Sequence, residues 1–167
     1  MHKRHADSNH SVAIQIDHAT EVIEALGTAY TMEIESVINY NAASINLDGV
    51  RAEEIKEALK HEVHDELGHA RKLGKRIHIL GGTIPGSQKL EFSQESMQPR
   101  MDSTDVVSII RGVIDAEEGA VEHYKKLIEM CEGVDYATQD LCIKLLGDEE
   151  EHRRKFQGFL KEYERRS

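Results

Sequence analysis

Two stretches of the sequence share one pattern, a glutamate followed three residues later by a histidine: HDELGHARKL at residues 64–73, with Glu66 and His69, and GDEEEHRRKF at residues 147–156, with Glu149 and His152. On a helix this spacing places both side chains on one face, where they can bind the same ion. A single copy carries little weight, because about one such pair is expected by chance in a sequence this rich in glutamate and histidine. The weight comes from the residues that accompany the two copies.

Each copy has a partner glutamate about one helix earlier in the sequence, Glu33 for the first and Glu117 for the second. The midpoint of the first pair falls between Gly49 and Val50, and that of the second at Gly133. Where a helical hairpin folds back at such a turn, the two glutamates of a pair lie at the same height along the bundle. Four carboxylates and two imidazoles from four helices therefore predict a site for two metal ions in the core of a bundle.

Apolar residues recur at helical spacing over four segments, which we expect to be helices at about residues 17–47, 52–80, 103–133 and 135–163. Both prolines, Pro85 and Pro99, lie between the second and third segments, where no helical stripe is present. We therefore expect an all-α fold, a four-helix bundle of two antiparallel hairpins joined by one long crossover, over residues 17–167. Residues 1–16 are polar and contain three histidines, and we expect them to form a flexible tail.

A glutamate interrupts the apolar stripe of each expected helix. A buried carboxylate without a partner is too costly to retain, so each one needs a cation or a hydrogen-bond donor. A carboxylate-rich site with one imidazole per metal suits iron or manganese better than copper or a structural zinc. In the third helix Glu117 lies on the apolar stripe, whereas the adjacent Glu118 lies with charged residues and remains the alternative ligand.

Several other side chains also need an interpretation. Tyr40 lies two helical turns after the first glutamate of the site, where its hydroxyl can hydrogen-bond a ligand, donate an electron, or simply be a core group. His61 and Asp65 form an i,i+4 pair, either a second iron contact or a solvated polar pair. Cys131 and Cys142 are most simply core residues near the last turn.

The composition excludes some classes of function. The formal net charge is −10, with 31 acidic against 21 basic residues, which disfavours binding to nucleic acid and favours attraction of cations. No apolar run is long enough for a transmembrane helix, and the polar N-terminus lacks the apolar segment of a signal peptide. The two cysteines have no C-x-x-C spacing. We expect a cytoplasmic protein with no membrane partner.

At these residues the sequence resembles the ferritin-like superfamily, and most closely bacterioferritins and Dps-like ferritins. The resemblance covers about residues 17–163 and is carried by HDELGHARKLGKRIHILGGTIP at residues 64–85 and LCIKLLGDEEEHRRKF at residues 141–156. It implies a ferritin-like four-helix bundle with two iron ions per subunit. It also implies particular roles: bridging for Glu66 and Glu149, terminal ligation for Glu33, Glu117, His69 and His152, a place beside the site for Tyr40, and an inner-surface iron site at His61 and Asp65.

Two departures from bacterioferritins refine the expectation. Leu67 stands where bacterioferritins have the methionine that binds haem, so no haem is expected. Few residues follow His152, which favours a twelve-subunit, Dps-like shell over one of twenty-four subunits. The resemblance implies a ferroxidase that oxidises Fe(II) with peroxide or dioxygen and stores the ferric product in a homo-oligomer. The alternatives are a non-storage di-iron or dimanganese peroxidase or catalase-like enzyme, and a DNA-protecting scaffold protein.

Overall fold

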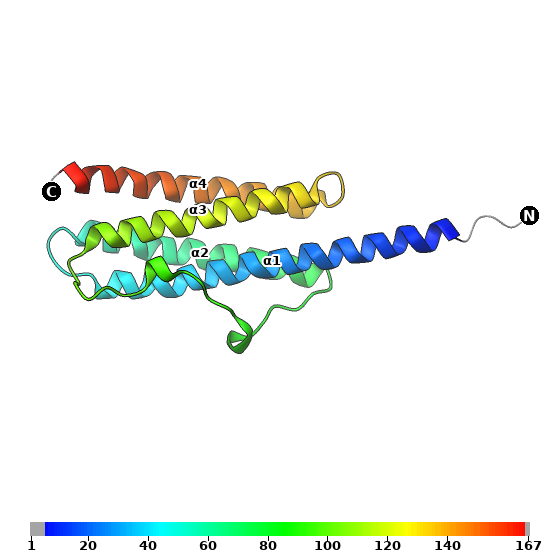
Figure 1. Ribbon diagram of the computed structural model, residues 1–167, viewed down its shortest axis with the longest axis horizontal. Helices are drawn as coiled ribbons and strands as arrows, with labels where there is room; N and C mark the ends of the chain where they lie inside the picture. Colours follow the sequence, from blue (N-terminus) through cyan, green and yellow to red (C-terminus); the bar gives the residue numbers. More distant parts are fainter. Residues whose placement is uncertain (1–5, 166–167) are drawn as a thin grey trace, which may run out of the picture.

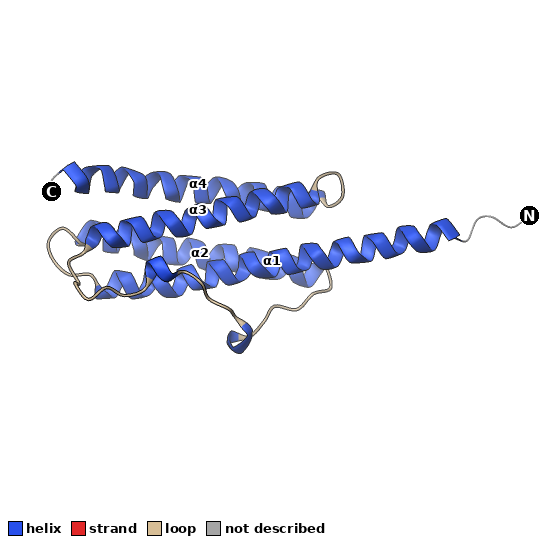
Figure 2. Cartoon of the chain, viewed as in Figure 1, coloured by secondary structure: helices blue, strands red, loops and turns tan. Residues whose placement is uncertain are grey.

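The computed structural model describes residues 6–165, with side chains from residue 18 onward. In this range the chain forms four long helices, α1 (Ala6–Asn46), α2 (Glu53–Ile79), α3 (Val106–Cys131) and α4 (Tyr136–Arg165) (Figure 1). Two 3-10 helices, η1 (Ser87–Lys89) and η2 (Glu95–Met97), lie between α2 and α3. The same residues contain no strand (Figure 2), which confirms the expected all-α class.

Glycines form the turns that the symmetric glutamate spacing predicted. Gly49, between α1 and α2, has a φ of 95°, and Gly133, between α3 and α4, has a φ of 69°. Residues with a side chain rarely adopt these left-handed values, so the chain can reverse direction most easily at these two positions. Helix α3 begins where Asp105 accepts a hydrogen bond from the Ser108 backbone N–H at 3.1 Å, as expected of an aspartate N-cap. The two hairpins are therefore encoded locally.

The crossover runs back along the bundle from the end of α2 to the start of α3 (Figure 1). It is fixed to α1 by the buried Glu35, which accepts hydrogen bonds from the backbone N–H groups of Ser93 and Gln94, both at 2.7 Å. It also lies so close to α3 that a Cβ atom on Gly112 would be 2.7 Å from the carbonyl oxygen of Ser96. These contacts hold the second hairpin beside the first, with α1 against α3 and α2 against α4.

Helix α1 begins at Ala6, well before the start that we expected near Asp17. Residues 6–16 contain neither proline nor glycine, and extending a helix costs much less than starting one. Their backbone is therefore helical where a flexible tail was predicted. Residues 1–5 lie outside the described part of the chain, and the division into a tail and a bundle stays a prediction.

Two apolar clusters occupy the two ends of the bundle. The cluster nearer the α1–α2 turn includes Leu47, Ile55, Leu59, Ile110 and Phe156. The cluster at the other end includes Leu26, Leu73, Leu127, Leu145 and both cysteines. Cys131 and Cys142 are buried free thiols in this cluster, in agreement with their expected core position. The polar residues of the candidate site lie between the two clusters.

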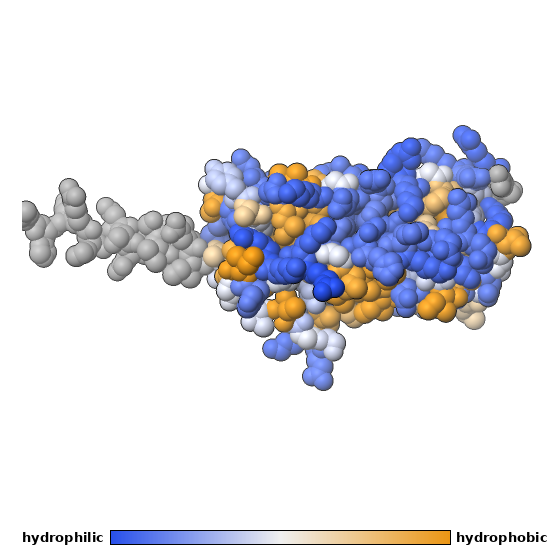
Figure 3. Space-filling view, turned by 180° about the vertical axis from the view of Figure 1, so that it is seen from behind, coloured by the Kyte–Doolittle hydropathy of each residue, from blue (hydrophilic) through white to orange (hydrophobic). Residues whose placement is uncertain are grey.

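The surface seen from behind is mainly hydrophilic, with separate apolar patches (Figure 3). Among the described residues, no helix is both long and apolar enough to cross a membrane.

Candidate metal centre

The six side chains that the sequence singled out come together in the middle of the bundle. They come from all four helices and all are buried: Glu33 on α1, Glu66 and His69 on α2, Glu117 on α3, and Glu149 and His152 on α4. Their ligand atoms form two groups, and within each group the atoms lie within 4.8 Å of one another. Glu66 and Glu149 belong to both groups, so the arrangement offers two adjacent metal positions.

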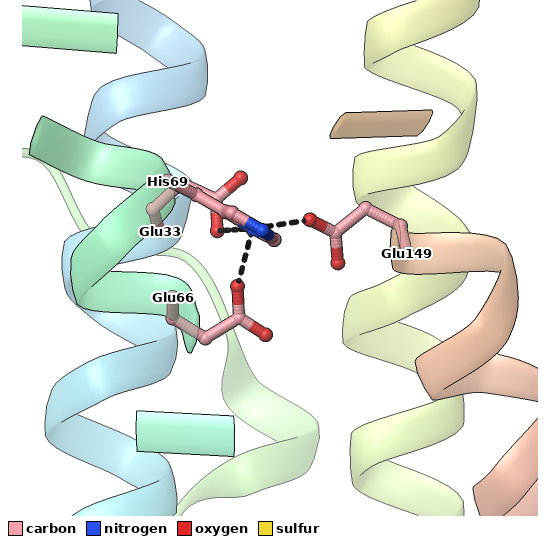
Figure 4. Close-up of side chains that lie close together, drawn as sticks. All are labelled: Glu33, Glu66, His69 and Glu149. Carbon is pink, nitrogen blue, oxygen red and sulfur yellow. Dashed lines mark hydrogen bonds and ion pairs between the residues drawn. The ribbon is translucent and has the colours of Figure 1, made fainter. Parts of the chain in front are cut away.

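At the first candidate metal position, three carboxylates lie around the imidazole of His69 (Figure 4). Its Nδ1 atom is 2.8 Å from Glu149 Oε1, 3.2 Å from Glu66 Oε2 and 3.7 Å from Glu33 Oε2. These carboxylates come from three different helices, so the position exists only when both hairpins are packed together.

The second metal position surrounds His152, whose Nδ1 atom is 3.4 Å from Glu66 Oε1, 3.5 Å from Glu149 Oε2 and 3.9 Å from Glu117 Oε2. The rings of His69 and His152 are stacked, with centroids 5.9 Å apart. Each shared carboxylate thus directs one oxygen towards each imidazole. This is the geometry that a carboxylate needs to bridge two metal ions.

Two tyrosines hold the carboxylates that are not shared. Tyr40 donates a 2.7 Å hydrogen bond to Glu117 Oε1, and Tyr124 donates one to Glu33 Oε1. Sequence reasoning selected Tyr40 but did not single out Tyr124. The signal was present, because Tyr124 follows Glu117 at the same spacing, seven residues, at which Tyr40 follows Glu33. Tyr40, which shares α1 with Glu33, thus holds Glu117 of the second position. Tyr124, which shares α3 with Glu117, holds Glu33 of the first position.

The structure distinguishes Glu117 from its neighbour. Glu117 is 2% exposed and contributes to the second position. The side chain of Glu118 is 60% exposed and lies 3.7 Å from Arg153 at the surface. The apolar stripe of the third helix therefore identified Glu117 as the residue that faces inward.

Further carboxylates contact the outer nitrogen of each imidazole. Asp148 Oδ2 is 3.2 Å from His69 Nε2, and Glu62 Oε2 is 3.1 Å from His152 Nε2. Such contacts orient a histidine and fix its tautomer, leaving Nδ1 to face the metal. Asp65, expected to act with His61, instead lies 3.9 Å from His152 Nε2. His61 is exposed and belongs to none of the candidate metal clusters among the described residues.

Proton affinities divide these groups into two kinds. Burial, together with the negative charges of Glu66 and Glu149, raises the pKa of Glu33 well above its usual range; burial and the charge of Glu66 do the same for Glu117. Burial also opposes ionisation of Glu149, but hydrogen bonds to His152 and His69 outweigh it and lower the pKa to about 2. The carboxyl groups of Glu33 and Glu117, which are not shared, therefore favour the neutral form. The shared carboxyl group of Glu149 favours the ionised form.

Both imidazoles favour the protonated form. Burial by itself would lower the pKa of His152, but hydrogen bonds to Glu149 and Glu66 outweigh burial and raise that pKa to about 10. The pKa of His69 is raised for the same reason, by Glu149, Glu33 and Glu66. Protons thus balance the carboxylate charge that two divalent cations would otherwise balance.

The donor set fits a pair of metal ions. Glu66 Oε1, Glu149 Oε1 and His152 Nδ1 are buried atoms that make ion-pair contacts within the site, at 2.8–3.5 Å, but no well-aligned hydrogen bond. Burying polar atoms without a well-aligned partner is costly, and a cation between them would satisfy all three. Carboxylate oxygens with one imidazole nitrogen per position suit iron or manganese.

A four-helix bundle with one glutamate from each of two helices and Glu-x-x-His from the other two is the arrangement of carboxylate-bridged dinuclear metal proteins. Residues 23–166 match the family model described as a ferritin-like domain. The chain belongs to the ferritin-like family.

Individual relatives agree with this assignment. The chain is 36% identical over 96 residues to a "Bacterial ferritin" of Neisseria meningitidis serogroup B, an alignment that covers 57% of this chain and 56% of that protein. The chain therefore spans about half the length of the curated relatives it matches first. The fold resembles a dodecameric thioferritin, the bacterioferritin-related protein from Bacteroides fragilis, with a TM-score of 0.74, 22% identity and coverage of 94% and 95% of the two chains. It also resembles Desulfovibrio desulfuricans bacterioferritin, with a TM-score of 0.76, 22% identity and coverage of 90% and 84%.

The expected ferritin-like four-helix bundle is thus confirmed. Membership of the family supports a function in iron storage or iron oxidation in general, and the clustered carboxylates and imidazoles support iron binding.

Proposed function

We propose that this protein oxidises Fe(II) at an intrasubunit dinuclear site and keeps the ferric product in an oligomeric shell. The observation that carries the proposal is the bridging geometry, in which Glu66 and Glu149 each direct one oxygen to His69 and the other to His152. An arrangement with two shared carboxylates holds two cations close together, so that both can react with one oxidant molecule. Iron is the proposed metal, and manganese fits the same donors.

Each ligand would have a defined task. Glu66 and Glu149 would hold both Fe(II) ions, with Glu33 and His69 completing the first position and Glu117 and His152 the second. Two Fe(II) ions supply two electrons, which reduce one hydrogen peroxide to two hydroxide ions or, with two protons, one dioxygen to hydrogen peroxide. The packed side chains around the site would shield these ligands from bulk water and keep the two positions at a fixed separation.

The tyrosines would act as positioning groups. Tyr40 donates a hydrogen bond to Glu117, and Tyr124 donates one to Glu33, so each unshared carboxylate keeps one oxygen occupied and presents the other to the metal. Burial and the neighbouring carboxylates raise the pKa of both phenols well above the usual range, so both remain hydrogen-bond donors at neutral pH.

The surface next to these positions offers a candidate entry side for Fe(II). A polar surface cavity of about 370 Å³ lies between α2 and α4, and both His69 and His152 form part of its wall. The acidic chain, with a formal net charge of −10, attracts cations towards such an opening. We infer that the substrate enters from this side.

We expect a cytoplasmic, haem-free homo-oligomer of twelve subunits with little affinity for nucleic acid. A non-storage di-iron or dimanganese peroxidase or catalase-like enzyme would use the same ligands but form a smaller assembly. A DNA-protecting scaffold would not oxidise added Fe(II). Native mass distinguishes storage from the first alternative, and an oxidation assay distinguishes it from the second.

The decisive experiment is Glu66→Ala, which removes a ligand from both positions at once. The rapid phase of Fe(II) oxidation should disappear while the helical circular dichroism spectrum remains. Glu118→Ala is the matched control, because it removes an exposed glutamate outside the site. A Glu66→Ala protein that oxidises Fe(II) at the wild-type initial rate would contradict the site, and an equal loss in Glu118→Ala would contradict its specificity.

A further inference from the structure

The two halves of the metal centre are related by an approximate twofold symmetry, which fails at one buried place. The matching pairs are Glu33 and Glu117, Glu66 and Glu149, His69 and His152, Tyr40 and Tyr124, and Asp65 and Asp148. Glu62 stands four residues before Glu66. At the matching place, four residues before Glu149, stands Leu145, a fully buried core residue. One half therefore has a buried carboxylate that the other half lacks.

Glu62 and Lys155 form an ion pair directly behind His152. The ammonium group of Lys155 lies 2.7 Å from Glu62 Oε1, and Glu62 Oε2 lies 3.1 Å from His152 Nε2. The pair therefore presents its carboxylate, and not its ammonium group, to the imidazole. The side chain of Glu62 is 1% exposed and that of Lys155 is 40% exposed, so water screens the positive charge more than the negative one.

The imidazole of His69 has a partner that is more open to solvent. Asp148 Oδ2 lies 3.2 Å from His69 Nε2, but the side chain of Asp148 is 49% exposed. Water and salt screen a half-exposed carboxylate, whereas a buried one keeps most of its electrostatic effect. Asp65, the counterpart of Asp148, lies 3.9 Å from His152 Nε2 and is exposed as well, so it adds little to the effect of Glu62.

The group behind a metal-binding imidazole affects how tightly the ring holds a cation. A cation at Nδ1 makes the ring more positive, and a negative charge beside Nε2 stabilises that change. A carboxylate in this place also makes the ligating nitrogen more basic, and removing such a carboxylate typically weakens metal binding by about 10–100-fold. Because both positions have ligands of the same kinds, the buried carboxylate behind His152 favours a cation at the second position.

We propose that Glu62 is a positioning residue that makes the second position the tighter of the two, so that the first Fe(II) ion binds beside His152 and the next beside His69. The inference rests on the proposed function, because it gives the order in which the dinuclear site fills. Lys155 supports Glu62 by contacting Oε1, which leaves Oε2 facing His152. Ordered filling holds one ion at a defined place until the second ion completes the pair that reacts with the oxidant.

The test uses Co(II), which remains divalent in air and binds oxygen and nitrogen donors. Full-length protein is stripped of metal and titrated with Co(II) by equilibrium dialysis, and anomalous diffraction from crystals loaded with one Co(II) per chain locates the ion. In the wild type the ion should prefer the second position, beside His152, by roughly tenfold over the first. Glu62→Gln keeps the size of the side chain but removes its charge, so the preference should fall to about twofold or less.

Two further variants complete the experiment. Asp148→Asn should weaken only the first position and so enlarge the preference for the second. Glu151→Gln removes another carboxylate from the cavity between α2 and α4, but one that belongs to none of the candidate clusters among the described residues, so it is the control and should leave the preference unchanged. Equal filling of the two positions in the wild type, or an unchanged preference in Glu62→Gln, overturns the inference. Dinuclear positions that stay empty in excess Co(II) would instead contradict the proposed function.

Discussion

The two proposed metal positions have the same kinds of candidate ligands, three glutamates and one histidine each, but different surroundings. Behind His69 lies one half-buried aspartate, Asp148, at 3.2 Å. Behind His152 lies a buried glutamate, Glu62, that is itself paired with Lys155. The inner ligands therefore make the two positions equivalent for bridging, whereas the charges behind the histidines make them unequal for loading. Position-specific variants can separate these two properties.

The largest effect is expected from variants that remove one position at a time. Glu33→Gln should empty the first position and Glu117→Gln the second, so each protein should bind one tight Co(II) where the wild type binds two. Rapid Fe(II) oxidation needs both electrons at one centre, so both variants should lose it, by roughly a hundredfold or more. Stopped-flow oxidation and metal stoichiometry provide the measurements.

Glu118→Gln is the matched control for Glu117→Gln, since the two residues are adjacent and only one is buried. It should bind two ions and oxidise Fe(II) normally. If Glu118→Gln rather than Glu117→Gln loses an ion, the assignment of the second position is wrong.

Metal loading should release protons and weaken as the pH falls. His152 has its pKa raised to about 10, and those of Glu33 and Glu117 are also raised, so in the metal-free protein these groups hold protons that a cation must displace. Lower pH strengthens the competing proton. Calorimetry in buffers of different ionisation enthalpy should show proton release, and Co(II) affinity should fall between about pH 8 and about pH 6. A pH-independent affinity over this range would contradict the proton balance.

Metal-free protein should lose thermal stability as the pH rises. The pKa of His152 is raised from 6.5 to about 10 on folding, so its stabilising contribution is complete below about pH 6.5 and disappears towards pH 10. Glu149 acts in the opposite sense, because its pKa is lowered from 4.5 to about 2 and its contribution is lost only as the pH falls through that range. The melting temperature should drop by several degrees between about pH 6.5 and about pH 10. Metal-loaded protein, in which cations replace the protons, should show a smaller drop.

The sequence predicted the helices and the inner ligands because both depend on local spacing. Gly49 and Gly133 define the two turns, and equal distances from them put the four glutamates at one height. Glu62 was missed because its importance depends on how α2 and α4 pack, and no single helix reveals which side chain meets His152. The early start of α1 was missed for another reason: polar residues without glycine or proline are compatible with both a tail and a helix.

Tyr124 was missed although its spacing matches that of Tyr40, and this pair gives the smallest expected effects. Tyr40→Phe and Tyr124→Phe each remove one buried hydrogen bond to an unshared carboxylate, at Glu117 and Glu33 respectively. Each should cost about 1–3 kcal/mol of stability, because a buried acceptor loses its donor. If the tyrosines only position carboxylates, both variants should slow Fe(II) oxidation by the same modest factor. A much slower rate in Tyr40→Phe alone would mean that this tyrosine donates an electron, and that the two halves of the centre differ in chemistry as well as in loading.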